Sequence, residues 1–193
     1  MTDPPGARDD AALVATVLAG NSRAFTELMR RHKDAIYRFI RHYVGDADEA
    51  YDLVQETFVA AWSALSTFDS AKPMRAWLRR IALNKCRDWT RRRQVRRFFF
   101  AADSIDAAGG VAAAPVSESA PETERQLDAL DRHISVLPAT LKEPLILTQF
   151  EGLSHKQAAR ILSISPKAVE MRVYRARAHL TAALALPTGE REG

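Results

Sequence analysis

The sequence predicts an all-α protein made of two small helical domains joined by a flexible linker. Apolar residues recur at steps of three and four along most of the 193-residue chain, as they do in amphipathic helices. No run of alternating β-branched residues indicates a sheet. Between residues 101 and 121 the composition changes to Ala, Gly, Ser, Pro and Asp, which is typical of a linker. Each flanking segment is shorter than about 100 residues, so each hydrophobic core is small.

The composition restricts the class of protein. Hydrophobic residues make up 47% of the chain and the formal net charge is +4. Cys86 is the only cysteine, which excludes an intrachain disulfide and a Cys-rich zinc site, and we expect it to be a small buried thiol. Residues 1–10 are polar and unlike a signal peptide, and no apolar run is long enough to span a membrane. We expect a cytoplasmic, soluble protein that binds no membrane, metal or cofactor and needs no homo-oligomer.

Four helices are expected before the linker. The first covers residues 11–19 and ends at Gly20, and the second begins after the capping residue Asn21 and ends at Gly45. A loop over residues 66–73 separates the third helix from a fourth that begins near Met74. The inward-facing positions of the third helix are Ala50, Leu53, Val54, Phe58, Ala61, Trp62 and Leu65.

The opposite face of the third helix mixes acidic and apolar side chains. Its residues are Asp52, Gln55, Glu56, Val59 and Ser63. Such a face suits docking on a basic partner helix. The alternative is an ordinary solvated helix face, which the sequence of this helix alone does not exclude.

The fourth helix carries a strong positive charge. Between residues 75 and 97 there are ten Lys and Arg residues and one acid, Asp88, a pattern that indicates phosphate binding. Trp77 and Trp89 lie within this run and Phe68 precedes it, so an aromatic ring could stack on unpaired bases. For Trp77 the alternative is core packing, because it shares a helix face with Ile81.

An aromatic triplet, residues 98–100, follows the basic run. It has two interpretations. The three phenylalanines either pack at the end of the first domain or dock on a partner.

The C-terminal segment contains the signals of a helix-turn-helix. Gly152 can end one helix, and Ser154 with Gln157 forms an S-x-x-Q capping box that starts the next. After a very short turn, Ser165 is an N-cap and Pro166 occupies the first helical position. Two helices joined by so few residues must cross at a steep angle.

The last helix is predicted to have a buried and a solvent-facing side. At about 100° per residue the inward side comprises Val169, Val173, Ala176 and Leu180. The outward side comprises Lys167, Met171, Tyr174 and Arg175, with Glu170 beside them and Arg172 and Arg177 on the flanks. In a helix-turn-helix this side meets base edges and phosphates in the major groove. A solvated surface helix is the alternative.

Three segments together resemble the extracytoplasmic-function (ECF) group of the sigma-70 family, which are bacterial transcription initiation factors. "DLVQETFVAAW" resembles the polymerase-binding signature, and "AWLRRIALNKCRDWTRRR" resembles the segment that recognises the −10 promoter element. The stretch from "LPATLKEP" to "RVYRARAHL" resembles the −35-binding domain. The resemblance covers roughly residues 21–93 and 126–180.

The resemblance implies a division of the chain and a set of partners. Residues 21–97 form sigma region 2, residues 98–122 the linker and residues 123–186 sigma region 4, with tails at 1–20 and 187–193. The implied partners are core RNA polymerase, promoter DNA and an anti-sigma factor. No catalytic residues stand out in the sequence, so the protein is expected to direct an enzyme without being one.

The resemblance also implies site residues. The polymerase-binding residues are Asp52, Gln55 and Glu56. The −10 DNA-binding residues are Phe68, Asp69, Ser70, Lys72, Arg80, Asn84, Arg87, Asp88 and Arg91, and residues 68–73 would hold a base flipped out of the duplex. The −35 DNA-binding residues are Ser165, Lys167, Ala168, Glu170, Met171, Arg172 and Arg175.

Five positions depart from the family pattern, and two of them, Glu170 and Met171, stand where small polar or basic residues are common. Tyr51 stands where the polymerase-binding signature usually has an acid. Ser163 stands where the turn of the helix-turn-helix usually has glycine, at a modest cost if its backbone is left-handed. Pro144 falls inside an expected helix, which is tolerable only near the first turn.

Two other classes of protein remain to be weighed. A dimeric helix-turn-helix regulator explains residues 154–180 but not the block from residue 46 to residue 97. A protein whose basic helix binds RNA or a membrane surface explains the charge but not the capped helix-turn-helix. A sigma factor explains both blocks.

Overall fold

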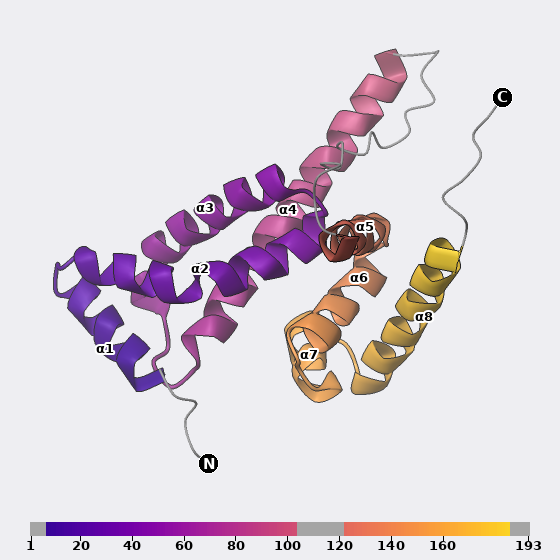
Figure 1. Cartoon of the computed structure of the whole chain (residues 1–193). Coiled ribbons are helices and arrows are strands. Elements are labelled where there is room, and N and C mark those ends of the chain that lie inside the picture. Colours follow the sequence, from indigo (N-terminus) through magenta and orange to yellow (C-terminus); the bar gives the residue numbers. More distant parts are fainter. Residues whose placement is uncertain (1–6, 104–121, 186–193) are drawn as a thin grey trace. The chain divides into compact units, whose positions relative to one another are not determined.

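The computed structural model describes residues 7–103 and 122–185, and within them every regular element is a helix (Figure 1). The chain divides into two compact units. The first comprises residues 1–40 and 47–116, and the second comprises residues 41–46 and 117–193. The all-α prediction is therefore confirmed. Most of the predicted linker and all of the C-terminal tail lie outside the described residues, as do residues 1–6 of the N-terminal segment.

The first unit is a helical bundle followed by a long helical extension. Its elements are α1 (Ala7–Leu18), α2 (Arg23–Val44) up to residue 40, α3 (Ala47–Ser63), the short 3₁₀ helix η1 (Leu65–Thr67) and α4 (Met74–Asp103). The last turn of α2 belongs to the second unit. Gly20 ends the first helical segment with a φ of +100°, and the Asn21 side chain caps α2 by accepting the Arg23 amide at 3.1 Å. Both helix boundaries agree with the sequence signals.

Two helices of this unit are longer than predicted. α1 begins at Ala7 and not at residue 11, because acidic residues in its first turn favour the helix N-terminus and Asp10 lies 2.9 Å from His32 of α2. α4 continues through Asp103, past the residue where the linker was expected to begin. Its last residues, "FFFAAD", contain neither Gly nor Pro, so nothing in them breaks the helix.

The packing of α3 against α4 forms the core that positions the first unit's surfaces. Leu53 and Phe58 of α3 and Leu78 and Cys86 of α4 are buried. Trp89 is only 5% exposed, and its Nε1 donates a hydrogen bond to Glu49 Oε2 at 2.7 Å. The buried thiol expected at Cys86 is confirmed.

One residue of the predicted inward face of α3 does not belong to the core. Trp62 is 46% exposed, and its ring meets Phe25 edge-on with centroids 4.9 Å apart. The periodicity placed Trp62 near the buried side, but the side chain lies at the rim of the bundle, where one ring face stays in water.

The second unit contains five helical segments. They are α5 (Glu122–Val136), α6 (Ala139–Leu145), a π-helical turn η2 (Ile146–Phe150), α7 (His155–Leu162) and α8 (Pro166–Ala185). The predicted inward side of α8 is buried at Val169, Val173, Ala176 and Leu180, which confirms its orientation.

The caps of the helix-turn-helix form as predicted. Ser154 Oγ accepts the Gln157 amide at 3.3 Å, and the Gln157 side chain accepts the Ser154 amide at 2.9 Å. Ser165 Oγ accepts the Ala168 amide at 3.1 Å. Each bond satisfies an amide that the helix itself leaves without a partner.

Pro144 does not lie in the first turn of its helix, contrary to the expectation. It is the penultimate residue of α6, where it cannot donate to the carbonyl of Thr140. The chain then widens into the π-helical turn η2, and Thr148 Oγ1 donates to the Pro144 carbonyl at 2.8 Å. The helix tolerates the proline because the regular pattern of α-helical hydrogen bonds ends at the next residue, Leu145.

We expect Trp89→Phe to destabilise the first unit by about 1–2 kcal/mol, because the change removes the hydrogen bond to Glu49 and keeps an aromatic ring in the core. Urea unfolding followed by far-ultraviolet circular dichroism measures the loss. Trp62→Phe is the matched control, since it makes the same change at a tryptophan that packs edge-on against Phe25. Equal losses in the two variants would show that the Trp89–Glu49 bond contributes nothing.

We expect Ser163→Gly to stabilise the second unit by up to about 1 kcal/mol. Ser163 has φ 55° and ψ 43°, which is a left-handed backbone conformation. This conformation is unfavourable in free energy for a residue with a Cβ atom and nearly neutral for glycine. Ser163→Val should lower stability instead, because a β-branched side chain fits this conformation worst. Urea unfolding compares the three proteins, and a Gly variant less stable than wild type contradicts the assignment.

Candidate functional site

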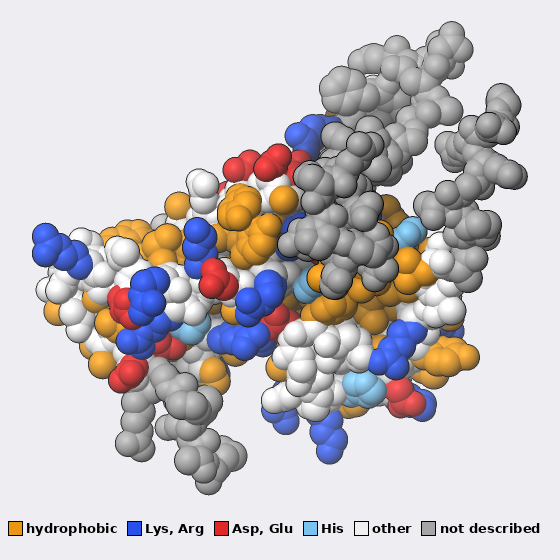
Figure 2. All heavy atoms as spheres, viewed as in Figure 1, with side chains coloured by type: hydrophobic (Ala, Val, Ile, Leu, Met, Phe, Trp, Pro, Cys, Tyr) orange, Lys and Arg blue, Asp and Glu red, His pale blue; other side chains and the backbone are white. Residues whose placement is uncertain are grey.

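The solvent-facing side of α3 carries the residues predicted to bind polymerase. Asp52 and Gln55 are exposed, Glu56 is half-buried, and Val59 is exposed beside them. Figure 2 shows acidic side chains gathered over α3 at the upper edge of the face in view. The structure thus brings the three predicted residues onto one accessible, mostly acidic surface.

Part of this acidic surface faces the basic helix α4. Lys85 Nζ and Arg92 Nη2 lie 3.3 Å and 3.5 Å from the two carboxylate oxygens of Glu56. A hollow between the helices is lined by Glu49, Asp52 and Glu56 of α3 and by Trp89, Arg91, Arg92, Val95 and Arg96 of α4. The sequence suggested that the α3 acids meet a partner's basic helix, and the structure shows that one of them also meets a basic helix of its own chain.

The −10 residues predicted on α4 lie along one side of the helix. Arg80, Asn84 and Arg91 are exposed, and Arg87 and Asp88 are half-buried. This side lies opposite the buried positions of α4, since the two sets are about half a helical turn apart at 100° per residue. Asp88 forms an ion pair with Arg91, so the acid orients a neighbouring guanidinium. We call these five residues the α4 stripe.

Not all of the basic run faces water. Arg79 is buried, and the Arg93 guanidinium lies 5.1 Å from the centre of the Trp89 ring. These two arginines therefore belong to the packing of the bundle and not to a phosphate-binding surface.

The loop before α4 is organised around Asp69. Its Oδ1 accepts the Ala71 amide at 3.0 Å, and its Oδ2 lies 3.0 Å from Lys72 Nζ. The hydrogen bond from Lys72, together with that of the Ala71 amide, holds the pKa of Asp69 below its usual range. Ser70 at the tip of the loop is exposed.

Phe68 and Trp77 close the base of this loop. Their rings meet edge-on with centroids 5.4 Å apart, and both side chains are half-buried. Trp77 is therefore neither a fully buried core residue nor a free stacking platform, and one side of the aromatic pair faces solvent next to the loop.

The outward side of α8 presents the residues predicted to read DNA. Lys167, Glu170, Met171 and Arg175 are exposed, whereas Ala168 and Arg172 are half-buried. Lys167 Nζ lies 3.0 Å from Glu170 Oε1, so the one acid of this side is paired with its neighbouring cation. The predicted site residue Ser165 uses its hydroxyl oxygen as the helix cap described above.

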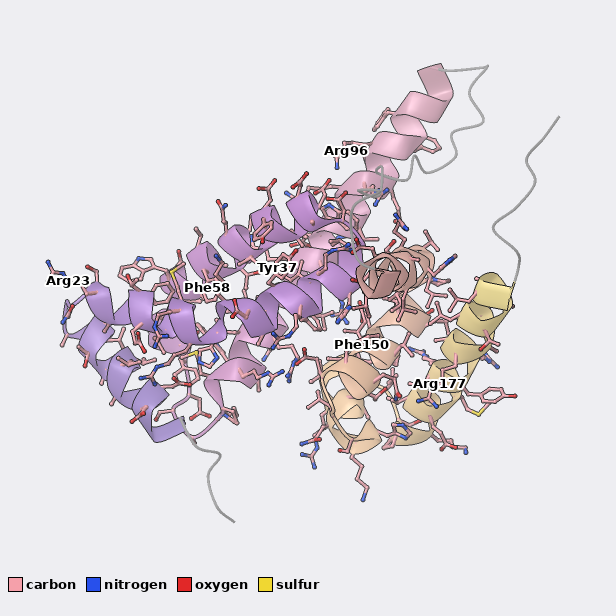
Figure 3. All side chains as sticks on the ribbon, viewed as in Figure 1. Arg23, Tyr37, Phe58, Arg96, Phe150 and Arg177 are labelled. Carbon is pink, nitrogen blue, oxygen red and sulfur yellow. The ribbon has the colours of Figure 1, made fainter. Side chains whose placement is uncertain are left out.

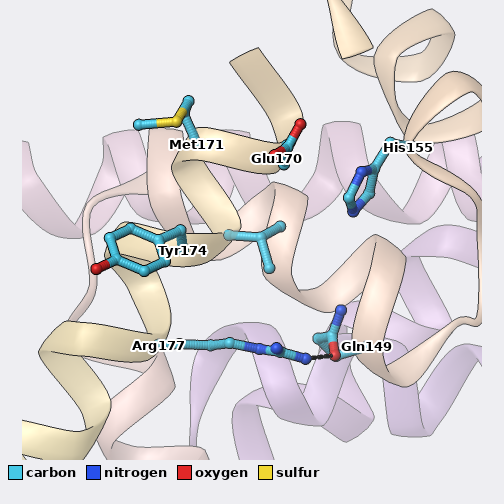
Figure 4. Close-up of a pocket in the computed structure, with 7 residues that line it drawn as sticks. Gln149, His155, Glu170, Met171, Tyr174 and Arg177 are labelled. Carbon is cyan, nitrogen blue, oxygen red and sulfur yellow. Dashed lines mark hydrogen bonds between the residues drawn. The ribbon is translucent and has the colours of Figure 1, made fainter. Parts of the chain in front are cut away.

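A hollow beside this side of α8 contains residues that the sequence did not single out as site residues (Figure 4). Gln149 and His155 line it from η2 and α7, and Tyr174 and Arg177 line it from α8. Arg177 donates a hydrogen bond to Gln149 Oε1. Tyr174 and Arg177 could have been predicted as site residues from their positions on the helix. Gln149 and His155 could not, because only the tertiary fold brings them close to α8.

The described residues contain no group of three or more His, Cys, Asp or Glu side chains placed to hold a metal ion. Among residues 7–103 and 122–185, no helix is long and apolar enough to cross a membrane.

Two family descriptions match the chain, one in each unit. Residues 28–96 match Sigma-70 region 2, and residues 127–180 match Sigma-70, region 4. RNA polymerase sigma factor NccH of Alcaligenes xylosoxydans xylosoxydans is 43% identical over 184 residues, which cover 95% of this chain and 97% of that protein. RNA polymerase sigma factor CnrH of Cupriavidus metallidurans is 42% identical over 179 residues, which cover 91% and 94%.

Solved structures of sigma factors are also similar. CnrH in complex with the cytosolic domain of CnrY matches with a TM-score of 0.63 and 35% identity, over 91% of this chain and 96% of that one. The sigma factor RpoE of Bartonella quintana, in complex with the anti-sigma factor NepR, matches with a TM-score of 0.65 and 26% identity, over 84% and 97%. The chain therefore belongs to the ECF group of the sigma-70 family of RNA polymerase sigma factors.

Proposed function

We propose that each of the three surfaces described above has a separate role in transcription initiation. The solvent-facing side of α3 docks on core RNA polymerase, the α4 stripe and the loop before it recognise and open the −10 element, and α8 reads the −35 element. The observation that carries this proposal is the segregation of charge in the first unit, where an acidic helix face and a basic one lie on adjacent helices.

The loop and the aromatic pair suit the capture of an unpaired base. Extruding a base from a duplex costs a few kcal/mol, which contacts to the flipped base and to phosphates must offset. Phe68 offers a ring edge beside the loop, and Ser70 and Lys72 offer exposed polar groups. The arginines of the α4 stripe supply the phosphate contacts that hold the strand.

The outward side of α8 suits the major groove of the −35 duplex. In this proposal Arg175 binds the DNA backbone, and Lys167, Glu170 and Met171 near the helix start meet base edges, for which their exposure is the support. A glutamate can accept a hydrogen bond from cytosine N4. In the structure the Glu170 carboxylate points toward Lys167 Nζ.

We further propose that an anti-sigma factor holds this protein in the cytoplasm until it is needed. The support is the similarity to RpoE of Bartonella quintana, whose structure contains the anti-sigma factor NepR. We assign no enzymatic activity to the chain itself, because a sigma factor directs the chemistry of polymerase.

We expect this protein to give promoter-specific transcripts when it is added to core polymerase purified without any sigma factor. Asp52→Arg should weaken polymerase binding by about tenfold or more, because it places a cation on the acidic docking surface. Co-purification and run-off transcription on genomic fragments measure both effects.

Asp9→Arg is the matched control for that charge reversal, since Asp9 is exposed on α1 and not on α3. It should leave polymerase binding unchanged. Wild-type protein that neither binds core polymerase nor supports transcription from any genomic promoter contradicts the proposed function.

We expect Arg175→Ala to weaken binding to −35 duplex DNA and to reduce the salt dependence of binding by about one unit of slope, because one phosphate contact is lost. Fluorescence anisotropy over a series of salt concentrations gives the slope. Arg23→Ala, which removes an exposed arginine from the other unit, should leave the slope unchanged. A wild-type slope in Arg175→Ala would show that Arg175 touches no phosphate.

A further inference from the structure

Gln149 and Arg177 join the π-helical turn η2 to the last helix, α8. Arg177 donates a hydrogen bond to Gln149 Oε1, which Figure 4 marks with a dashed line. Both residues are exposed, and Figure 3 labels Arg177 on α8. The two partners are 28 positions apart in the sequence, so the fold of the second unit brings them together.

The turn that follows Pro144 orients the amide of Gln149. Thr148 Oγ1 donates a hydrogen bond to the Pro144 carbonyl at 2.8 Å, and the same oxygen accepts one from Gln149 Nε2 at 3.0 Å. Exchanging the two amide atoms of Gln149 would set its N–H donors against those of Arg177. The turn therefore presents an acceptor, and not a donor, to α8.

The bond to Gln149 leaves the charge of Arg177 unbalanced. The partner is a neutral amide, and no acid among the described residues forms an ion pair with Arg177. Among the described residues that line the hollow beside α8, Glu170 is the only acid, and Lys167 Nζ lies 3.0 Å and 3.1 Å from its two oxygens. A guanidinium has five N–H donors, so Arg177 keeps donors for a second partner.

Arg177 lies on the side of α8 that the proposed function assigns to DNA. It follows Glu170 by seven residues, which places the two within about 20° around the helix axis and about 10 Å apart along it. The first residues of such a helix meet base edges in a groove about 12 Å wide. A side chain about 10 Å further along the helix is then near the rim of the groove, where the phosphates are. A phosphate can accept two N–H donors of one guanidinium.

We propose that Gln149 is a positioning residue for −35 recognition, because it directs Arg177 toward one phosphate of the DNA backbone without neutralising it. This inference rests on the proposed function, in which α8 reads the −35 element. A carboxylate in the place of Gln149 would also accept a hydrogen bond from Arg177, but it would form an ion pair and compete with the phosphate. The neutral amide orients the guanidinium and leaves its charge for DNA.

The test uses Gln149→Glu, which keeps the size of the side chain and adds one negative charge beside Arg177. Holoenzyme is formed from the full chain and core polymerase. The DNA is a genomic promoter fragment that supports run-off transcription, and a second fragment has the same sequence with the −35 element scrambled. Affinity is measured over a series of salt concentrations, co-purification measures core binding, and urea unfolding checks that the variant is folded.

We expect Gln149→Glu to weaken binding of the promoter fragment by about fivefold at 0.15 M salt and to reduce the salt slope by about one unit, because one phosphate contact is lost. Core binding should not change. Gln149→Leu, which removes the acceptor and adds no charge, should keep the wild-type slope and lose about twofold of affinity, because Arg177 must then be ordered on binding.

A double-mutant cycle with Arg177→Ala separates this role from simple repulsion of DNA by the new carboxylate. Arg177→Ala alone should reproduce the loss of affinity and of slope. In that background Gln149→Glu should cause no further loss, because its effect acts through Arg177.

Three outcomes overturn the inference. Wild-type affinity and slope in Gln149→Glu would show that the charge of Arg177 is not used on DNA. A full further loss in the Arg177→Ala background would show that the new carboxylate repels DNA directly. Loss of core binding in Gln149→Glu would make this surface a polymerase contact. Wild-type holoenzyme that binds both fragments equally would instead contradict the proposed role of α8.

Discussion

The packing of α3 against α4 is the constraint on which the functional surfaces of the first unit depend. Because Leu53, Phe58, Leu78 and Cys86 are buried in it, each helix has only its remaining sides for contact with other molecules. The Trp89–Glu49 hydrogen bond fixes the two helices at the same level along their axes. One shared core therefore sets the distance between the surface that we propose for polymerase and the surface that we propose for the −10 element.

The ion pairs across these helices have a different role from the core. Glu56 with Lys85 and Arg92 is a partly exposed cluster, and pairs of this kind contribute little to stability. These ion pairs do partly neutralise the opposite charges on the facing sides of α3 and α4. A partner that binds the Glu56 carboxylate would compete with these two α4 cations for it.

Local features of the structure could be predicted from the sequence, and contacts between distant residues could not. The caps at Ser154 and Ser165 and the buried side of α8 depend on residues three or four positions apart, so the sequence shows them directly. The candidate residues on α3 and α8 were placed on the expected faces for the same reason. The Glu56–Lys85 pair joins residues 29 positions apart, and the solvent exposure of Phe98 depends on where α2 and α3 end. The spacing of apolar residues along the sequence gives no information on this ion pair or on the exposure of Phe98.

The two caps of the helix-turn-helix have a consequence for folding order. The bonds that begin α7 and α8 close loops of three residues, and a loop so short costs little chain entropy. Helical units rich in local contacts fold fast. We therefore expect the two helices between Ser154 and Ala185 to begin forming from these local bonds before the long-range contacts of the unit are made. Local bonds thus set where both helices of the segment proposed for the −35 element begin, whereas the buried side of α8 needs α6 to pack against.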